Sequence, residues 1–156
     1  MPSLAATGKS VDAIARDHWA TYGRNYYARH DYEGVESERA DALMAELRGR
    51  LATLPGTRFG DLVVETADDF AYHDPTDGSV SRNQGVRVLF EGGSRVVFRL
   101  SGTGTSGATL RVYLERFEAD AIDGETGAMR EQIVAAADMI AGIVRHTGRT
   151  GPDVVT

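Results

Sequence analysis

The chain has no cysteine, only one lysine, and no apolar run that approaches the length of a membrane-spanning helix. Without cysteine, disulfide bonds and thiolate metal sites are excluded. Without about 20 consecutive apolar residues, a membrane partner is not expected. The first residues also lack the apolar stretch of a secretory signal, so we expect a cytoplasmic protein.

Basic residues are outnumbered, and the formal net charge is -6. Nucleic-acid binding usually needs a basic surface, so we expect no nucleic-acid partner. Lys9 is the only lysine among 17 basic residues, which makes arginine the dominant cation. Arginine binds oxyanions bidentately, but this bias also fits genome composition. Only the position of each arginine can decide between the two interpretations.

The rest of the composition is that of one ordinary domain, with 156 residues, 42% of them hydrophobic. Apolar periodicity and turn residues predict helices over 10–22, 33–54 and 127–146, and strands over 62–65, 85–91, 94–101 and 109–117. Helices followed by strand hairpins favour an α+β fold, an antiparallel sheet with helices on one face.

The loop between the last two predicted strands is the most informative segment, reading RLSGTGTSGATLR from Arg99 to Arg111. If the hairpin is symmetric about Thr105, Arg99 faces Arg111 and Arg95 faces Glu115. Two opposed arginines repel each other unless an anion lies between them. Glycine amides and hydroxyl groups in the loop suit the same anion.

Two questions stay open at this point. The alternative to an anion site is an ordinary solvated hairpin loop, which has the same glycine, serine and threonine composition. One arginine also fits poorly, because a two-residue turn at Gly92-Gly93 would place Arg87 opposite Phe98, on the apolar face.

Other polar or aromatic groups have simpler interpretations. The segment containing Asp74 and Asp77 is turn-like and lacks EF-hand spacing, and the four histidines lack metal-ligand spacing, so no metal site is predicted. Four tyrosines could stack on sugars or bases, although packing between domains is the preferred interpretation. They are Tyr22, Tyr26, Tyr27 and Tyr32.

The loop sequence closely resembles the phosphate-binding loop in the last domain of α-D-phosphoglucomutases. DHWATYGRNYYARHDYE at 17–33, DPTDGSVSRNQGVR at 74–87 and the tail at 147–156 resemble that family in the same order. The resemblance implies a TATA-binding-protein-like α+β domain. It also implies an isomerase of carbohydrate metabolism that interconverts glucose 1-phosphate and glucose 6-phosphate, using a phosphoserine, Mg²⁺ and glucose 1,6-bisphosphate.

Carried over residue by residue, the resemblance implies that the loop holds the substrate phosphate that is not being transferred. The contacts fall on Arg99, Ser101, Gly102, Thr103 and Arg111. Gly104 is expected to shape the loop, and Arg24 is a second candidate to face the same cleft.

The family's phosphoserine, magnesium loop and sugar-recognition loop have no counterpart in this chain. We therefore expect a remnant of a third domain over 1–23 and a C-terminal domain over 24–156, with no catalytic or metal-binding residue, no cofactor of its own, and no activity alone. Its partners would be a phosphosugar and the remaining mutase domains. The alternatives are a stand-alone phosphosugar- or anion-binding module and a structural domain with an unused loop.

Overall fold

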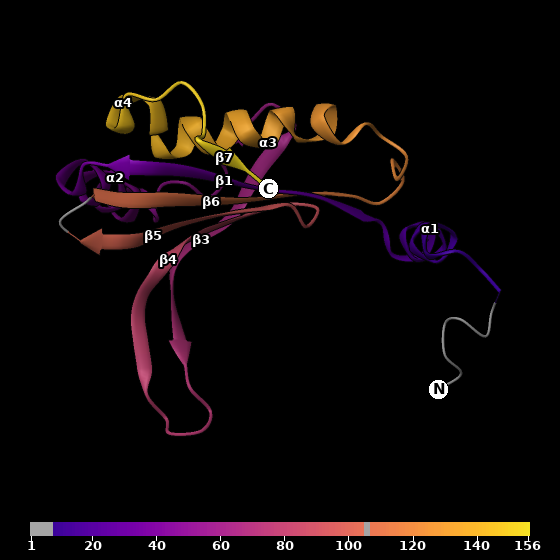
Figure 1. Cartoon of the computed structure of the whole chain (residues 1–156), viewed down its shortest axis with the longest axis horizontal. Coiled ribbons are helices and arrows are strands. Elements are labelled where there is room, and N and C mark those ends of the chain that lie inside the picture. Colours follow the sequence, from indigo (N-terminus) through magenta and orange to yellow (C-terminus); the bar gives the residue numbers. More distant parts are fainter. Residues whose placement is uncertain (1–7, 105–106) are drawn as a thin grey trace.

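A computed structural model describes residues 8–104 and 107–156 and contains one antiparallel sheet covered by helices (Figure 1). The strand order is β2-β3-β4-β5-β6-β1-β7. The strands are β1 (Arg24–Val35), β2 (Arg58–Phe59), β3 (Leu62–His73), β4 (Val80–Phe90), β5 (Arg95–Gly104), β6 (Gly107–Glu118) and β7 (Val154–Val155). The helices are α1 (Val11–Tyr22), α2 (Ser37–Arg50), α3 (Thr126–Ala141) and α4 (Ile143–Thr147).

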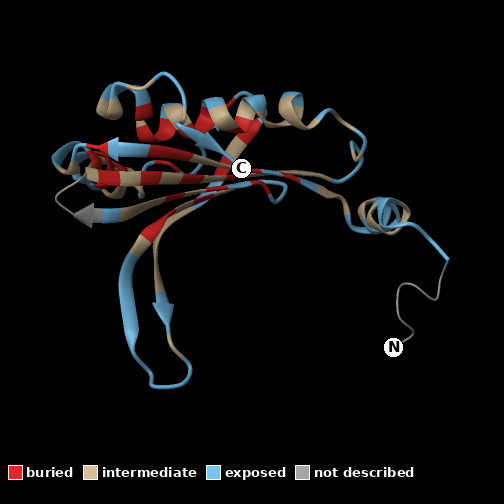
Figure 2. Ribbon diagram, viewed as in Figure 1, coloured by how far each residue is buried: buried red, intermediate tan, exposed pale blue. Residues whose placement is uncertain are grey.

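The hydrophobic core lies between one face of the sheet and the helices α2, α3 and α4. Alternate residues of β4, β5 and β6, such as Val88, Phe98 and Leu114, are fully buried against Leu43 of α2 and Ile133 of α3. Figure 2 shows the buried residues concentrated in this layer. The expected α+β fold, with helices on one face of an antiparallel sheet, is confirmed.

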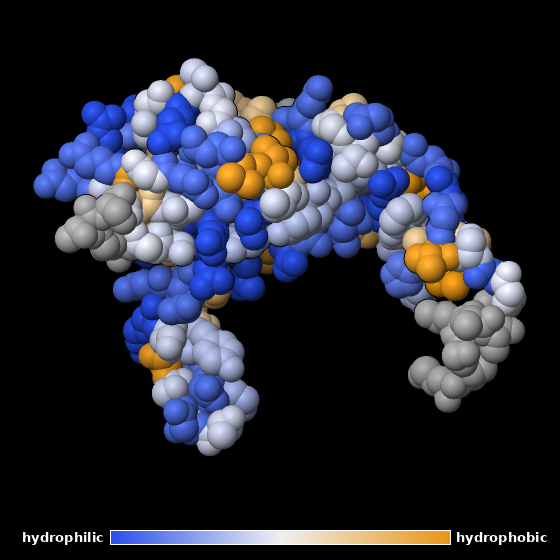
Figure 3. Space-filling model, viewed as in Figure 1, coloured by the Kyte–Doolittle hydropathy of each residue, from blue (hydrophilic) through white to orange (hydrophobic). Residues whose placement is uncertain are grey.

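The other face of the sheet is open. The β3–β4 hairpin forms an arm that extends well beyond the core, and α1 projects from the opposite end (Figure 1). The space-filling view shows an arched molecule, with the arm and α1 on either side of the open face (Figure 3). Within 8–104 and 107–156, no helix combines the length and apolar character needed to cross a membrane.

The first helix matches its prediction closely. The Ser10 side chain accepts a hydrogen bond from the amide of Ala13, and Gly23 ends the helix with a φ of 81°. No residue of α1 is buried. The local capping signals therefore predict both ends of α1 although none of its residues is buried in the core.

The segment after α1 departs from the prediction. Residues 24–35 form strand β1, which the abundance of aromatic side chains concealed, and α2 spans Ser37–Arg50 instead of 33–54. Tyr26, Ala28 and Tyr32 are buried in alternation, and β1 pairs with β6. Tyr26 and Tyr32 therefore belong to the core of this domain, and their predicted role in packing between domains is wrong.

Both strands of the β3–β4 arm are longer than predicted, since the sequence indicated strands only over 62–65 and 85–91. Cross-strand pairing continues to His73 and Val80, and the turn between them is held locally. Asp74 accepts a hydrogen bond from the Thr76 amide at 2.7 Å, and Asp77 accepts one from the Ser79 amide at 2.8 Å. This is the predicted turn structure, and in the part of the chain described no acidic or histidine cluster could hold a metal ion.

The turn between β4 and β5 has three residues, Glu91 to Gly93, closed by a hydrogen bond from the Phe90 amide to the Ser94 carbonyl oxygen. The prediction of a two-residue turn at Gly92-Gly93 was therefore wrong, because the turn is one residue longer. The observed register pairs Val86 with Phe98 and Arg87 with Val97, so Arg87 lies on the open face. This corrected register removes the misfit noted in the sequence.

The last predicted helix is divided in two at Gly142. Its φ of 59° and ψ of 44° are left-handed, and its amide donates to the Asp138 carbonyl oxygen. A glycine in this conformation ends a helix at little cost. Val144, expected on the apolar stripe, is therefore exposed on α4.

Gly85 lets three strands approach closely, and its replacement by alanine should destabilise the domain. An added Cβ would lie 2.6 Å from the Phe98 carbonyl oxygen and 2.8 Å from Cγ of Arg99. We expect Gly85→Ala to lower the free energy of unfolding by about 1–3 kcal/mol in urea titrations.

The matched control is Gly49→Ala in α2, where an added Cβ would meet no atom within 4 Å. It should stabilise the protein by about 0.5–1 kcal/mol through helix propensity. A neutral Gly85→Ala would show that the strands can separate without cost.

Candidate functional site

Arg99 of β5 and Arg111 of β6 are direct cross-strand partners on the open face of the sheet. The pairing continues from Arg95 with Glu115 to Leu100 with Leu110, which is the register expected from the sequence. Phe98 and Val112, which alternate with the arginines, are buried under the helices. The alternation of one hairpin therefore places two like charges side by side.

Other arginines on this face are neutralised by carboxylates. Arg87 makes two hydrogen bonds to Asp68, at 3.1 and 2.6 Å, and these raise the pKa of the guanidinium above its ordinary value. Arg95 forms an ion pair with Glu115, its cross-strand partner. Neither of these arginines needs an external anion.

Arg99 differs, because its polar contacts are to a neutral residue. Its Nε donates to the Gln84 carbonyl oxygen at 3.0 Å, and its Nη2 lies 3.5 Å from the Gln84 side-chain oxygen. Among residues 8–104 and 107–156, no carboxylate forms an ion pair with it. The guanidinium is also 6.0 Å from the Phe70 ring centroid.

Arg111 shares a single carboxylate with Arg29. Asp31 is only 4% exposed, and its Oδ1 accepts a hydrogen bond from Arg29 Nε at 2.9 Å. Its Oδ2 lies 3.9 Å from Arg111 Nε, a buried atom with no hydrogen-bond partner. Three guanidiniums at this end of the sheet are thus balanced by one carboxylate, which leaves an excess of two positive charges.

A pocket of about 160 Å³ opens at the arginine pair. It is lined by Arg99, Leu100, Ser101, Arg111 and Tyr113. A dianion of phosphate size matches both its charge and its scale, because guanidinium groups bind phosphate oxygens through charge-assisted hydrogen bonds.

The glycine-rich end of the hairpin borders this pocket. Ser101 pairs with Thr109, and the register shifts before Gly104 pairs with Gly107. Gly102 has a φ of 67° and is exposed, with open space around it. Thr103 follows Gly102 in β5 and precedes Gly104. The hydroxyl groups of 105 and 106, which the sequence also suggested as donors, lie outside the described residues.

Arg24 is not brought to the arginine pair. It pairs with Glu118 at the opposite end of β1, whereas Arg111 pairs with Asp31. Its guanidinium stacks over Trp19 at 4.2 Å and Tyr26 at 4.3 Å, and donates to the Ile122 carbonyl oxygen at 2.7 Å. These contacts join α1 to the segment before α3.

The sequence analysis missed Arg29 and Asp31. They lie in the segment that was not predicted to be a strand, so their shared face could not be assigned. The signal was present, because Tyr26, Ala28 and Tyr32 alternate with them as buried residues. Reading that alternation as a strand would have placed both side chains on the same face of that strand, whereas their position beside Arg111 depends on the pairing of β1 with β6.

Comparison with known proteins identifies the family and the fold of the chain. A family model described as "Phosphoglucomutase-1, C-terminal domain" matches residues 24–153. A phosphoglucomutase from Rhizobium radiobacter is 59% identical over 98% of this chain, and phosphoglucomutase-1 from Homo sapiens is 45% identical over 98%. A crystal structure of the open form of pp63/parafusin, a phosphoglucomutase from Paramecium, superposes with a TM-score of 0.85 at 42% identity, covering 94% of this chain and 25% of that one.

The chain therefore belongs to the phosphoglucomutase family, as its C-terminal domain. It spans 29% of the length of the two curated relatives named above. The fold and the pair Arg99 and Arg111 thus correspond to one part of these longer relatives.

Asp31 should contribute to stability well beyond an ordinary surface carboxylate. Replacing it by asparagine leaves Arg29 and Arg111 without their shared counter-charge in a largely buried place. We expect Asp31→Asn to lower the free energy of unfolding by about 1–3 kcal/mol in phosphate-free urea titrations. Glu115→Gln, next to an Arg95 side chain that is 53% exposed, should cost less than about 1 kcal/mol. Equal losses would contradict this account of the charge balance.

Proposed function

We propose that this chain supplies the wall of a phosphoglucomutase active site that holds the non-transferred phosphate of the substrate. The observation that carries the proposal is the opposed pair Arg99 and Arg111, which lines one small pocket on the open face. Together with Arg29 and Asp31, the pair leaves two positive charges in excess. A phosphate monoester dianion complements that excess.

The predicted contacts combine side-chain and backbone donors. The guanidiniums of Arg99 and Arg111 chelate phosphate oxygens, and the Ser101 and Thr103 hydroxyls donate to the same group. The amides around Gly102 approach closely because glycine adds no side chain, and Gly104 shapes the bend. Arg24 stays a candidate for a different part of the cleft, at the other end of β1.

In this proposal the domain positions the substrate and makes no bond. Binding energy from the remote phosphate holds the sugar while chemistry occurs at its other end, during interconversion of glucose 1-phosphate and glucose 6-phosphate. A site that recognises phosphate through guanidiniums and amides accepts either isomer. It also accepts the glucose 1,6-bisphosphate intermediate in both orientations.

The resemblance implies Mg²⁺ for the whole enzyme. The described residues provide no group of three or more carboxylates or histidines that could bind it. We propose the cytoplasm as the compartment, consistent with the lack of cysteine.

The test is a titration of the isotope-labelled chain with inorganic phosphate at low ionic strength, followed by NMR. Amide signals of residues 101–104 should shift. Arg99→Ala and Arg111→Ala should each weaken binding at least about tenfold, because each removes charge-assisted hydrogen bonds.

Arg87→Ala is the matched control, since Arg87 lies on the same face but is neutralised by Asp68. Its phosphate affinity should stay within about twofold of the parent chain. The proposal fails if the loop amides do not move, or if all three variants weaken binding equally. The chain alone should also show no mutase activity above background.

A further inference from the structure

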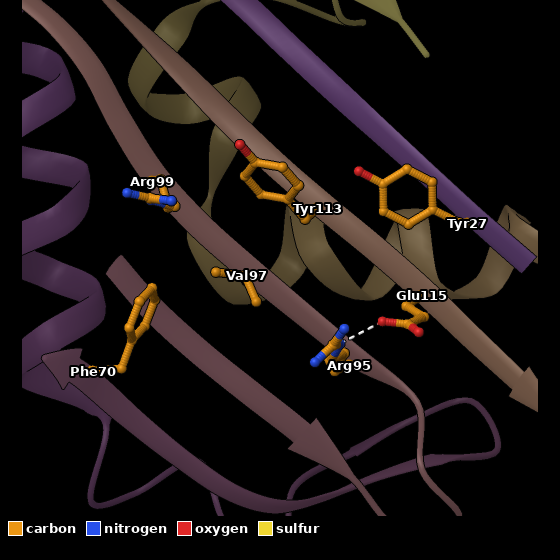
Figure 4. A pocket seen from close by; sticks show the side chains of 7 residues that line it. All are labelled: Tyr27, Phe70, Arg95, Val97, Arg99, Tyr113 and Glu115. Atoms are coloured by element: carbon orange, nitrogen blue, oxygen red, sulfur yellow. Dashed lines mark hydrogen bonds and ion pairs between the residues drawn. The ribbon is translucent and has the colours of Figure 1, made fainter. Parts of the chain in front are cut away.

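A second pocket, of about 230 Å³, adjoins the arginine pair on the same face of the sheet (Figure 4). It is lined by Tyr27, Phe70, Arg95, Val97, Arg99, Tyr113 and Glu115. Arg99 and Tyr113 line both this pocket and the smaller one. A ligand held by its anionic end at Arg111 can therefore reach the larger pocket.

Aromatic side chains surround this second pocket. Tyr27, Tyr113 and Phe70 come from β1, β6 and β3, and Figure 4 shows all three projecting from the sheet around Val97. Tyr27 is 50% exposed, whereas its neighbour Tyr26 on the other face of β1 is buried in the core. Exposed rings with a polar hydroxyl suit ligands that have one apolar face and many hydroxyl groups.

Two of the three charged groups of this pocket, Arg95 and Glu115, balance each other, and the third, Arg99, belongs to the arginine pair. Arg95 and Glu115 form an ion pair at its edge, drawn as a dashed line in Figure 4. A neutral pair does not attract a second phosphate, but its guanidinium donates hydrogen bonds and its carboxylate accepts them. Sugar hydroxyls do both, so they match this pair better than an anion or an apolar group.

We infer that this second pocket binds the pyranose ring of a phosphosugar whose phosphate lies at the arginine pair. The inference rests on the proposed function. The pocket is smaller than the 300–1,000 Å³ or so of a typical enclosed site, so it contacts only one face of the ring. Stacking on a C–H face does not depend on which carbon carries the phosphate, so glucose 1-phosphate and glucose 6-phosphate both gain affinity.

The experiment compares glucose 6-phosphate with glycerol 3-phosphate, a phosphomonoester without a ring, by NMR titration of the full chain. Glucose 6-phosphate should bind about three- to tenfold more tightly, and it alone should shift the ring signals of Tyr27 and Tyr113. Tyr27→Leu should abolish that ratio while leaving the affinity for glycerol 3-phosphate unchanged, since Tyr27 lines only the larger pocket.

Tyr113→Leu is a second variant, judged by the same ratio of affinities. Tyr22→Leu is the matched control, because Tyr22 is 67% exposed on α1 and lines neither pocket, and it should keep the ratio. Equal affinities for the two ligands in the parent chain, or a ratio that survives Tyr27→Leu, would overturn the inference while phosphate binding stands. Failure of both ligands to bind would overturn the proposed function itself.

Discussion

The pairing of β5 with β6 is the constraint on which the rest of the site depends. Burial of Phe98 and Leu110 under the helices fixes which residues face the core, and the two-residue period then places Arg99 and Arg111 together on the open side. The hydrophobic core thus places two like charges on neighbouring strands, directly opposite each other. Burial of the apolar face therefore holds the arginine pair together despite its repulsion, which Asp31 limits.

Asp31 can limit that repulsion because it is only 4% exposed, in a strand that is paired along its outer edge with the C-terminal strand. β7 pairs with β1 at His30 and Asp31, and the Asp153 amide donates to the Asp31 carbonyl oxygen at 2.8 Å. A carboxylate shielded from water interacts more strongly with nearby guanidiniums than an exposed one. The edge strand, distant in sequence, thus pairs with the residue whose carboxylate balances Arg29 and Arg111.

The sequence was most informative where local patterns repeat. The cross-strand register of Arg99 and Arg111 followed from alternation about a symmetric loop, and the ends of α1 followed from Ser10 and Gly23. Strand β1 was missed because tyrosines obscured its alternation and because pairing with β6, a partner far along the chain, decides its structure. Arg29 and Asp31 were missed with it. No local pattern could reveal a face shared by distant strands.

The three-residue turn after Phe90 has a consequence for sequence variation. Surface turns usually tolerate insertions and deletions. Here the loss of one residue would exchange the two faces of β4, turning Arg87 toward Leu43 and Ile133 and turning Val86 and Val88 toward water. The length of the turn from Glu91 to Gly93 thus determines which residues of β4 face the core. Among relatives with this fold, we expect the length of this turn to vary less than its residues do.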